Sequence, residues 1–174
     1  FVNAVSGGNL YRGASFLLDQ LHKPIFPAHI SIFQQPHLLA GIGSAPFDSD
    51  GVITREQYYV RDGILCNYVL GSYSARKLQL ATTGNAGGVY NLNVTHSNDN
   101  LSALLKKMHQ GLLVTDLMGQ GTNILTGNYS RGASGFWVDK GEVQFPVEEI
   151  TIASNLADMF QGIIAIANDV DRRG

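Results

Sequence analysis

Apolar and polar residues alternate most regularly in the second half of the chain, and there they predict a long β-hairpin. Two patterned runs, residues 133–138 and 142–152, are separated by Asp139-Lys140-Gly141. Alternating residues on both sides of a glycine-containing connection are typical of two antiparallel strands joined by a tight turn. An earlier run over residues 112–117 predicts a further strand.

The first half of the chain carries shorter patterns. We predict a helix from an Asn9 cap to about His22, because its apolar positions fit a helical period: Leu10, Ala14, Leu17, Leu18 and Leu21. Residues 30–33 predict a short strand, and residues 36–51 predict a long loop. The Asp62-Gly63 pair predicts a hairpin between strands over residues 56–60 and 64–70.

Four more elements complete the predicted order. Ser72 is expected to cap a short helix that ends near Leu78, and residues 89–95 predict a strand. Asn98 or Asp99 is expected to cap a helix with an apolar face. That face carries Leu101, Leu104, Leu105 and Met108. Asn155 is expected to cap a last helix, from Leu156 to about Ala167.

Strands dominate this order and are mostly joined by short turns. The helices are few and do not alternate regularly with the strands, which argues against a doubly wound parallel sheet. We therefore predict an α+β domain over residues 1–174, with largely antiparallel sheets and a few flanking helices.

Composition narrows the function classes. A hydrophobic fraction of 44% is ordinary for a globular core, and a net charge of −2 offers no basic field for nucleic acid. No apolar run approaches the roughly 20 residues needed to span a bilayer. The single cysteine, Cys66, excludes an internal disulfide and suits the reducing cytoplasm. Since residue 1 is Phe and no signal-peptide pattern follows, we expect a piece of a longer cytoplasmic chain.

A glycine-rich loop leads into the predicted hairpin and is the first candidate site. It contains Gly119, Gly121 and Asn128 and ends at Arg131. Glycine is used where a backbone takes positive φ or comes close to another chain. A polar loop held on a rigid hairpin is suited to binding an extended peptide or a partner.

Arg131 is the sharpest single candidate in that loop. A guanidinium between Ser130 and Gly132 could hold a carboxylate or a backbone carbonyl through two parallel hydrogen bonds. The alternative is a structural ion pair with Asp116, Glu148 or Glu149. The pattern alone leaves both interpretations open.

Two further candidates lie near the middle of the chain. Ser74 and Lys77 match the S-x-x-K pattern of serine acyl-enzymes, but the companion S-D-N and K-T-G motifs are missing. The same segment fits a helix start with Arg76 at the surface, or with Arg76 facing a cleft and fixing a carboxylate. Asn85, in a glycine loop over residues 82–88, fits either a cleft lining or a tight connection.

Metal chemistry is not expected within this sequence. No two of its histidines are spaced as HExxH or HExxxH, the helical spacings of zinc peptidases. Cys66 lies in a strand pattern and is expected to be a buried structural thiol. Trp137, with Phe136 and Phe145, is expected in the core.

Several blocks in consistent order carry a resemblance to a known family. The longest are residues 127–138, GNYSRGASGFWV, and 146–153, PVEEITIA. Shorter blocks are Leu18-Asp19, Ser44-Ala45-Pro46-Phe47-Asp48, residues 73–78, residues 83–88 and residues 118–121. Together they cover nearly the whole chain. The sequence resembles the C-terminal domain of the PmbA (TldE) branch of the TldD/PmbA peptidase family.

The resemblance implies both a fold and a function. The fold would be the same α+β class, and the function would be that of a subunit of a two-subunit cytoplasmic zinc metallopeptidase acting on unfolded or modified peptides. A TldD-type partner would supply the zinc and the chemistry, and this chain would hold no metal. The alternative is a non-enzymatic interaction module, as the older family label, modulator of DNA gyrase, implies. Neither reading involves direct contact with nucleic acid or a membrane.

Overall fold

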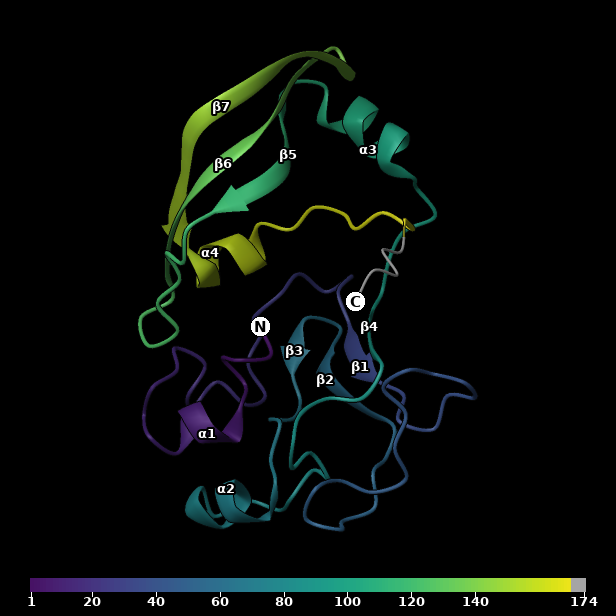
Figure 1. Cartoon of the computed structure of the whole chain (residues 1–174), viewed down its shortest axis with the longest axis vertical. Helices are drawn as coiled ribbons and strands as arrows, with labels where there is room; N and C mark the ends of the chain where they lie inside the picture. The colour runs from purple at the N-terminus through teal and green to yellow at the C-terminus, as the bar shows by residue number, and fades with distance from the viewer. Residues whose placement is uncertain (170–174) are drawn as a thin grey trace.

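Two antiparallel sheets lie in opposite halves of the molecule (Figure 1). The computed structural model describes residues 1–169. One sheet has four short strands in the order β3-β2-β1-β4, and the other has three longer strands in the order β5-β6-β7. The predicted α+β class, with largely antiparallel sheets and a few flanking helices, is confirmed.

The four-stranded sheet is built from β1 (Ile32–Gln34), β2 (Gln57–Arg61), β3 (Ile64–Leu65) and β4 (Leu92–Val94). The β2–β3 turn forms at the predicted Asp62-Gly63 pair, where both residues take positive φ, +50° and +79°. Long irregular segments surround this sheet, together with α1 (Gly7–Leu10) and α2 (Ser72–Lys77).

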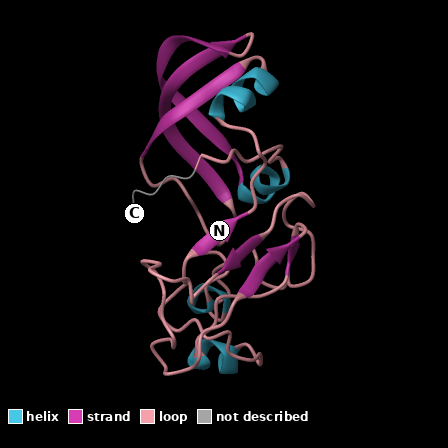
Figure 2. Cartoon of the chain, turned by 90° about the vertical axis from the view of Figure 1, so that its right-hand side faces the viewer, coloured by secondary structure: helices cyan, strands magenta, loops and turns pink. Residues whose placement is uncertain are grey.

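The three-stranded sheet contains β5 (Gly111–Met118), β6 (Asn128–Asp139) and β7 (Glu142–Asn155). Figure 2 shows these strands as a long twisted ribbon, and register shifts interrupt both of its pairings. Such irregularities bend strands and increase their twist. Two helices flank the ribbon, α3 (Leu101–Met108) and α4 (Leu156–Gln161). Within the described chain, no helix has the length and apolar content needed to cross a membrane.

The hydrophobic core lies in the half that contains the four-stranded sheet. Its members with almost no exposed surface include Val5, Leu10, Ile30, Tyr59 and Leu65. Burial of such side chains stabilises the fold by about 1.5–3 kcal/mol each. The three-stranded sheet contributes two well-buried apolar residues among those described, Ala133 and Val138.

Helix α4 ties the two halves together. The Phe160 ring stacks on the Phe26 ring at 4.6 Å between centroids and lies 6.0 Å from the Phe16 ring. The Gln161 side-chain amide donates to the Pro24 carbonyl at 3.1 Å. Since α4 directly follows β7, these contacts fix the end of the long hairpin against the core.

The predicted helix from Asn9 to His22 is wrong. Helix α1 ends at Leu10, and Gly13 turns the chain with a φ of +67°. The Asn9 side chain caps no helix and instead donates to the Asn3 carbonyl. Leu17 is still buried, so an irregular path reaches the core positions that suggested a helical period.

Other predicted elements are present with different boundaries. Strand β3 ends at Leu65 rather than residue 70, and α4 ends at Gln161 rather than near Ala167. Asn100 caps α3 in place of Asn98 or Asp99, and Gly71 precedes α2 in place of Ser72. The Asn155 cap is confirmed, because its side-chain oxygen accepts a hydrogen bond from the Ala157 N–H.

The predicted aromatic core on the hairpin is also wrong. Phe136 and Phe145 are 37% and 57% exposed, and Trp137 is only half-buried. Leu117, Met118 and Val143 on the same sheet are exposed as well. The alternation predicted strands correctly, but within residues 1–169 little packs against these strands to cover their apolar side chains.

Candidate functional site

The loop between β5 and β6 is held by its own hydrogen bonds. The Ser130 N–H donates to the Gly121 carbonyl at 2.7 Å, and the Asn123 N–H donates to the Asn128 carbonyl at 2.8 Å. Gly119 and Gly127 take positive φ, +79° and +78°, where the chain turns. The loop therefore has a defined shape, as the glycine pattern predicts.

Arg131 extends from β6 toward β5 beside this loop. Its Nη2 donates to the Leu117 carbonyl at 3.1 Å, whereas its Nε is buried and has no hydrogen-bond partner. No described carboxylate pairs with it, since Lys107–Asp99 is the ion pair found within residues 1–169. The alternative of an ion pair with Asp116, Glu148 or Glu149 is therefore wrong for the described chain.

A cavity of about 640 Å³ opens beside Arg131. Its apolar walls come from Phe1, Val2, Ile124, Leu156 and Phe160, and its polar groups come from Asn3, Gln120, Thr122 and Arg131. Gly119 also lines it. The volume lies in the range of small-ligand sites, which are mostly apolar with a few placed polar groups. We take this cavity and its loop as the candidate site.

The predicted site residues separate into two groups. Gly119 and Arg131 line the cavity, Gly121 packs against Ser130, and Asn128 starts β6 at the end of the same loop. Arg76 is exposed on α2, in the opposite half of the molecule (Figure 1). Asn85 bonds Gln34 of β1 and Gln57 of β2, so it lies in that half as well. A common cleft for Arg76 and the glycine-rich loop is therefore not formed.

Asn85 belongs to a buried network of neutral polar side chains. Its amide group donates to Gln34 Oε1 at 2.9 Å and to the Gly88 carbonyl at 2.7 Å, and its oxygen accepts from Gln57 at 2.8 Å. The Tyr59 hydroxyl donates to the same Gln34 oxygen at 2.6 Å, and burial raises the pKa of this phenol. The network gives Asn85 structural partners, which suits a tight connection. Asn85 also lines a cavity of about 500 Å³ with Tyr73, Gly87 and Gly88, so the cleft lining that its loop predicted is present as well.

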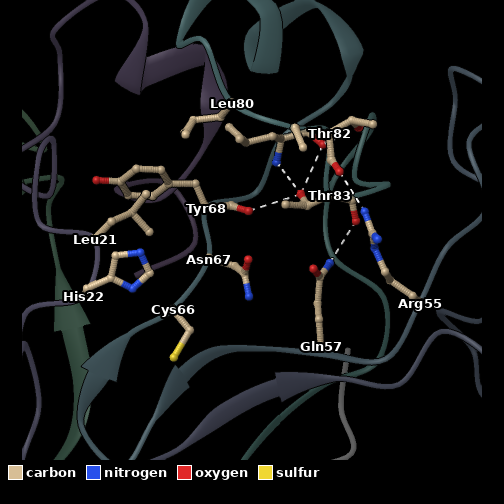
Figure 3. A pocket seen from close by; sticks show the side chains of 12 residues that line it. Leu21, His22, Arg55, Gln57, Cys66, Asn67, Tyr68, Leu80, Thr82 and Thr83 are labelled. Atoms are coloured by element: carbon tan, nitrogen blue, oxygen red, sulfur yellow. Dashed lines mark hydrogen bonds between the residues drawn. The ribbon is translucent and has the colours of Figure 1, made fainter.

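A second cavity, next to Cys66, has walls whose polar side chains are mostly paired (Figure 3). Arg55 donates to the Thr82 carbonyl at 2.7 Å, and Thr83 Oγ1 bonds the backbone on both sides of Val69. Cys66 and His22 also line this space. Cys66 is half-buried, so the prediction of a buried thiol is wrong; β3 has already ended at Leu65.

The serine–lysine pair suggested by S-x-x-K does not form. Ser74 Oγ donates to the Gly71 carbonyl at 3.1 Å, within the first turn of α2. The Lys77 ammonium lies 5.7 Å from the centre of the Tyr73 ring. A nucleophile requires its base within hydrogen-bonding reach, so this segment is a helix start, as its alternative interpretation held.

The cavity beside Arg131 contains residues that the sequence patterns did not select. Ile124, Leu156 and Phe160 were assigned to a loop and a helix with no site role. These three residues come from separate parts of the chain. They line the same cavity only because α4 folds back against the core. A sequence pattern within one element does not predict a contact between distant segments.

Comparison with known proteins assigns this α+β domain to a family. Residues 1–174 match the PmbA/TldA metallopeptidase C-terminal domain. The chain therefore belongs to the PmbA/TldA metallopeptidase family. The resemblance inferred from the sequence blocks is confirmed.

Two curated relatives share about half of their aligned residues with this chain. The chain is 51% identical to metalloprotease PmbA of Escherichia coli O157:H7 over 172 residues, which is 99% of this chain and 38% of the relative. It is 53% identical to the metalloprotease PmbA homolog of Haemophilus influenzae over 174 residues, 99% of this chain and 39% of that one. The chain thus spans about two fifths of their length.

Solved structures share the fold. A Bacteroides thetaiotaomicron protein described as a candidate modulator of DNA gyrase aligns with a TM-score of 0.92 at 30% identity, covering 97% of this chain and 38% of that protein. TldE from Thermococcus kodakarensis aligns with a TM-score of 0.77 at 22% identity, over 92% of this chain and 39% of that one, and this second likeness concerns the fold alone.

Proposed function

We propose that this chain is the C-terminal domain of a PmbA-type subunit in a two-subunit cytoplasmic metallopeptidase that acts on unfolded or modified peptides. A TldD-type partner supplies the zinc and the catalytic chemistry. The observation that carries the proposal is the family match over residues 1–174 together with about 50% identity to metalloproteases named PmbA.

Residues 1–169 do not by themselves assemble a zinc centre. A catalytic zinc needs three protein ligands from His, Cys, Asp or Glu around an open position. Residues 1–169 contain no group of three such side chains placed to share an ion. Zinc, where it is bound in the complex, activates water and polarises the peptide carbonyl. The contribution proposed for this chain is to bind and orient the peptide and to contact the partner.

The three-stranded sheet supports a role in holding extended chain. Strands β5 and β7 are its two edges, so each has an edge to which a peptide could add as a further strand. Strand addition holds the backbone of a peptide through ladder hydrogen bonds and is tolerant of sequence, which suits unfolded substrates. Gly119, Gly121, Asn128 and Arg131 stand at one end of this sheet and are proposed substrate or interface residues.

The exposed apolar side chains of the same sheet support contact with protein. Phe136, Val143 and Phe145 are all more than a third exposed, and apolar surface of this kind marks interaction sites when it is contiguous. It would be covered in the assembled peptidase. Arg76, exposed in the other half of the molecule, is proposed for the subunit contact. Asn85 is buried in that half and is proposed to support that surface from within.

An interaction module without peptidase activity is the second candidate function. It is favoured by the description of the Bacteroides thetaiotaomicron relative as a candidate modulator of DNA gyrase. Such a module would bind protein through the exposed sheet. Neither function requires direct binding to nucleic acid, and 12 lysines and arginines against 14 acidic residues provide no strong basic field.

A peptide-hydrolysis assay separates the two functions. The full-length protein, a TldD-type partner and their equimolar mixture are each given an unfolded peptide, with and without a chelator. We expect turnover in the mixture, none with the full-length protein alone, and loss of turnover with the chelator. A mixture that binds but never cleaves peptide would favour the interaction module. Turnover by the full-length protein alone would refute the partner's role.

A further inference from the structure

The cavity beside Arg131 holds a positive charge that no lining residue balances. None of the ten residues around it is acidic, and Arg131 is the one arginine or lysine among them. Water has limited access to the N–H groups of a half-buried guanidinium. An anion that accepts hydrogen bonds from these groups therefore stabilises the guanidinium. The electrostatics of the cavity therefore favour a ligand that brings a negatively charged group to Arg131.

Arg131 retains the capacity to bind such a ligand. A guanidinium has five N–H donors. Within the described chain its side chain makes one hydrogen bond, from Nη2 to the Leu117 carbonyl, and its buried Nε–H has no acceptor. Its role in holding β5 to β6 thus uses a small part of its bonding capacity.

The other groups around the cavity are of two kinds. Ile124, Leu156 and Phe160 form an apolar wall next to the cation. The side chains of Asn3, Gln120 and Thr122 are exposed, and none of them bonds another side chain or backbone group among residues 1–169. Amide and hydroxyl groups in this position can bond the N–H and C=O of a peptide.

We propose that this cavity binds the C-terminal carboxylate of a peptide whose last side chain is apolar. The proposal rests on the proposed function, in which the ligand of this domain is a peptide. An α-carboxylate and an apolar side chain on one residue lie one carbon apart, so one residue can meet Arg131 and the apolar wall together. An aspartate or glutamate side chain ends in its carboxylate and leaves that wall empty.

Equilibrium binding to the full-length protein tests this directly. Two fluorescent peptides of one sequence ending in Leu are compared by anisotropy, one with a free carboxylate and one with a C-terminal amide, in the presence of a chelator. We expect the carboxylate peptide to bind about tenfold more tightly or better, the effect of a hydrogen bond to a charged group. Replacing the last Leu by Gly should weaken its binding. If the wild-type protein binds the carboxylate peptide and the amide peptide with equal affinity, the proposal is overturned.

Two variants assign the preference to the cavity. Arg131→Gln should bring the carboxylate-to-amide ratio to one, and Arg12→Gln, which makes the same substitution at an exposed position, should leave it intact. Gln120→Glu, an exposed substitution that places an acid in the cavity, should abolish the preference even where Arg131→Gln fails to fold. A preference retained in Gln120→Glu and in folded Arg131→Gln overturns the assignment.

The outcomes also separate this inference from the proposed function. Peptide turnover in the two-subunit mixture, with no preference between carboxylate and amide peptides, refutes the carboxylate site and leaves the proposed function standing. Lack of turnover together with a carboxylate preference abolished by Gln120→Glu refutes the peptidase role and keeps the site.

Discussion

Ser130 and Gly121 lie against each other where the glycine-rich loop returns to β6. The Ser130 N–H donates to the Gly121 carbonyl at 2.7 Å, and a Cβ on residue 121 would overlap the Ser130 carbonyl oxygen. The close approach explains glycine at this position by contact rather than by an unusual φ. It also links the shape of the loop to the strand that carries Arg131.

Gly121→Ala should therefore destabilise the protein. The overlap is with backbone, which cannot rotate away, so we expect a loss of about 1–3 kcal/mol in the free energy of unfolding, the usual cost of overpacking. Urea unfolding measures it. Gly8→Ala is the matched control, because a Cβ there meets only ordinary contacts. If both variants unfold at the wild-type urea concentration, the loop is looser than described.

The Asp48 carboxylate should make the stability of the fold decrease at acidic pH. Burial alone raises the pKa of this carboxyl, but hydrogen bonds from the N–H groups of Ala86, Val52 and Asp50 outweigh burial and lower it below its ordinary 3.8. A lowered folded-state pKa stabilises the fold fully above the unfolded value, and this stabilisation is lost as the pH falls through the folded value.

The test is Asp48→Asn. Its amide NH₂ cannot accept the Ala86 N–H bond, so we expect about 1–3 kcal/mol lower stability at pH 7. The gap to wild type should shrink as the pH falls below about 4, where the wild-type carboxylate becomes protonated. Asp62→Asn, at an exposed turn, is the control. A gap between wild type and Asp48→Asn that is constant from pH 7 to pH 3 would contradict the account.

The Cys66 thiol should react in the folded protein. It is half-buried, lines an open cavity, and is the one cysteine of the sequence, so a thiol reagent reports on it alone. We expect labelling by a small reagent such as dithionitrobenzoate without denaturant. Labelling that appears only in urea would restore the buried thiol that the strand pattern predicts.

Phe160→Ala should loosen the attachment of the long hairpin to the core. The ring contacts Phe26 and Phe16 and forms part of the cavity wall. Replacing a fully buried phenylalanine by alanine lowers the free energy of unfolding by about 3–5 kcal/mol. Phe160 is half-buried, so we expect a smaller loss. Phe136→Ala, on the exposed sheet, should cost clearly less. Calorimetric midpoints of the two variants compare them, and equal midpoints would argue that α4 does not anchor the hairpin.

The β6–β7 hairpin could be predicted from sequence because its determinants are local. Alternation fixes two strands, and Lys140 and Gly141 both take positive φ in the two-residue turn between them. The helix predicted from Asn9 failed because Gly13 leaves the helical path and Leu17 reaches the core without it. Periodicity reports which residues are buried more reliably than the path that buries them.

The candidate site was predictable only in part. The glycines and Arg131 could be selected, because close approach and an isolated guanidinium both have sequence signals. The partners of Arg131 could not, since the choice between an ion pair and the Leu117 carbonyl depends on the β5–β6 register. The exposure of Phe136 and Phe145 could not be predicted either, because the sequence of an apolar face does not show which segment packs against it.

The zinc content of the full-length protein, purified without chelator and measured by elemental analysis alone and after assembly with a TldD-type partner, tests the central claim most directly. The account predicts well under one zinc per chain for the protein alone, and about one zinc per pair once the partner is bound. One tightly held zinc per chain in the protein alone would contradict the assignment of the metal and the chemistry to the partner.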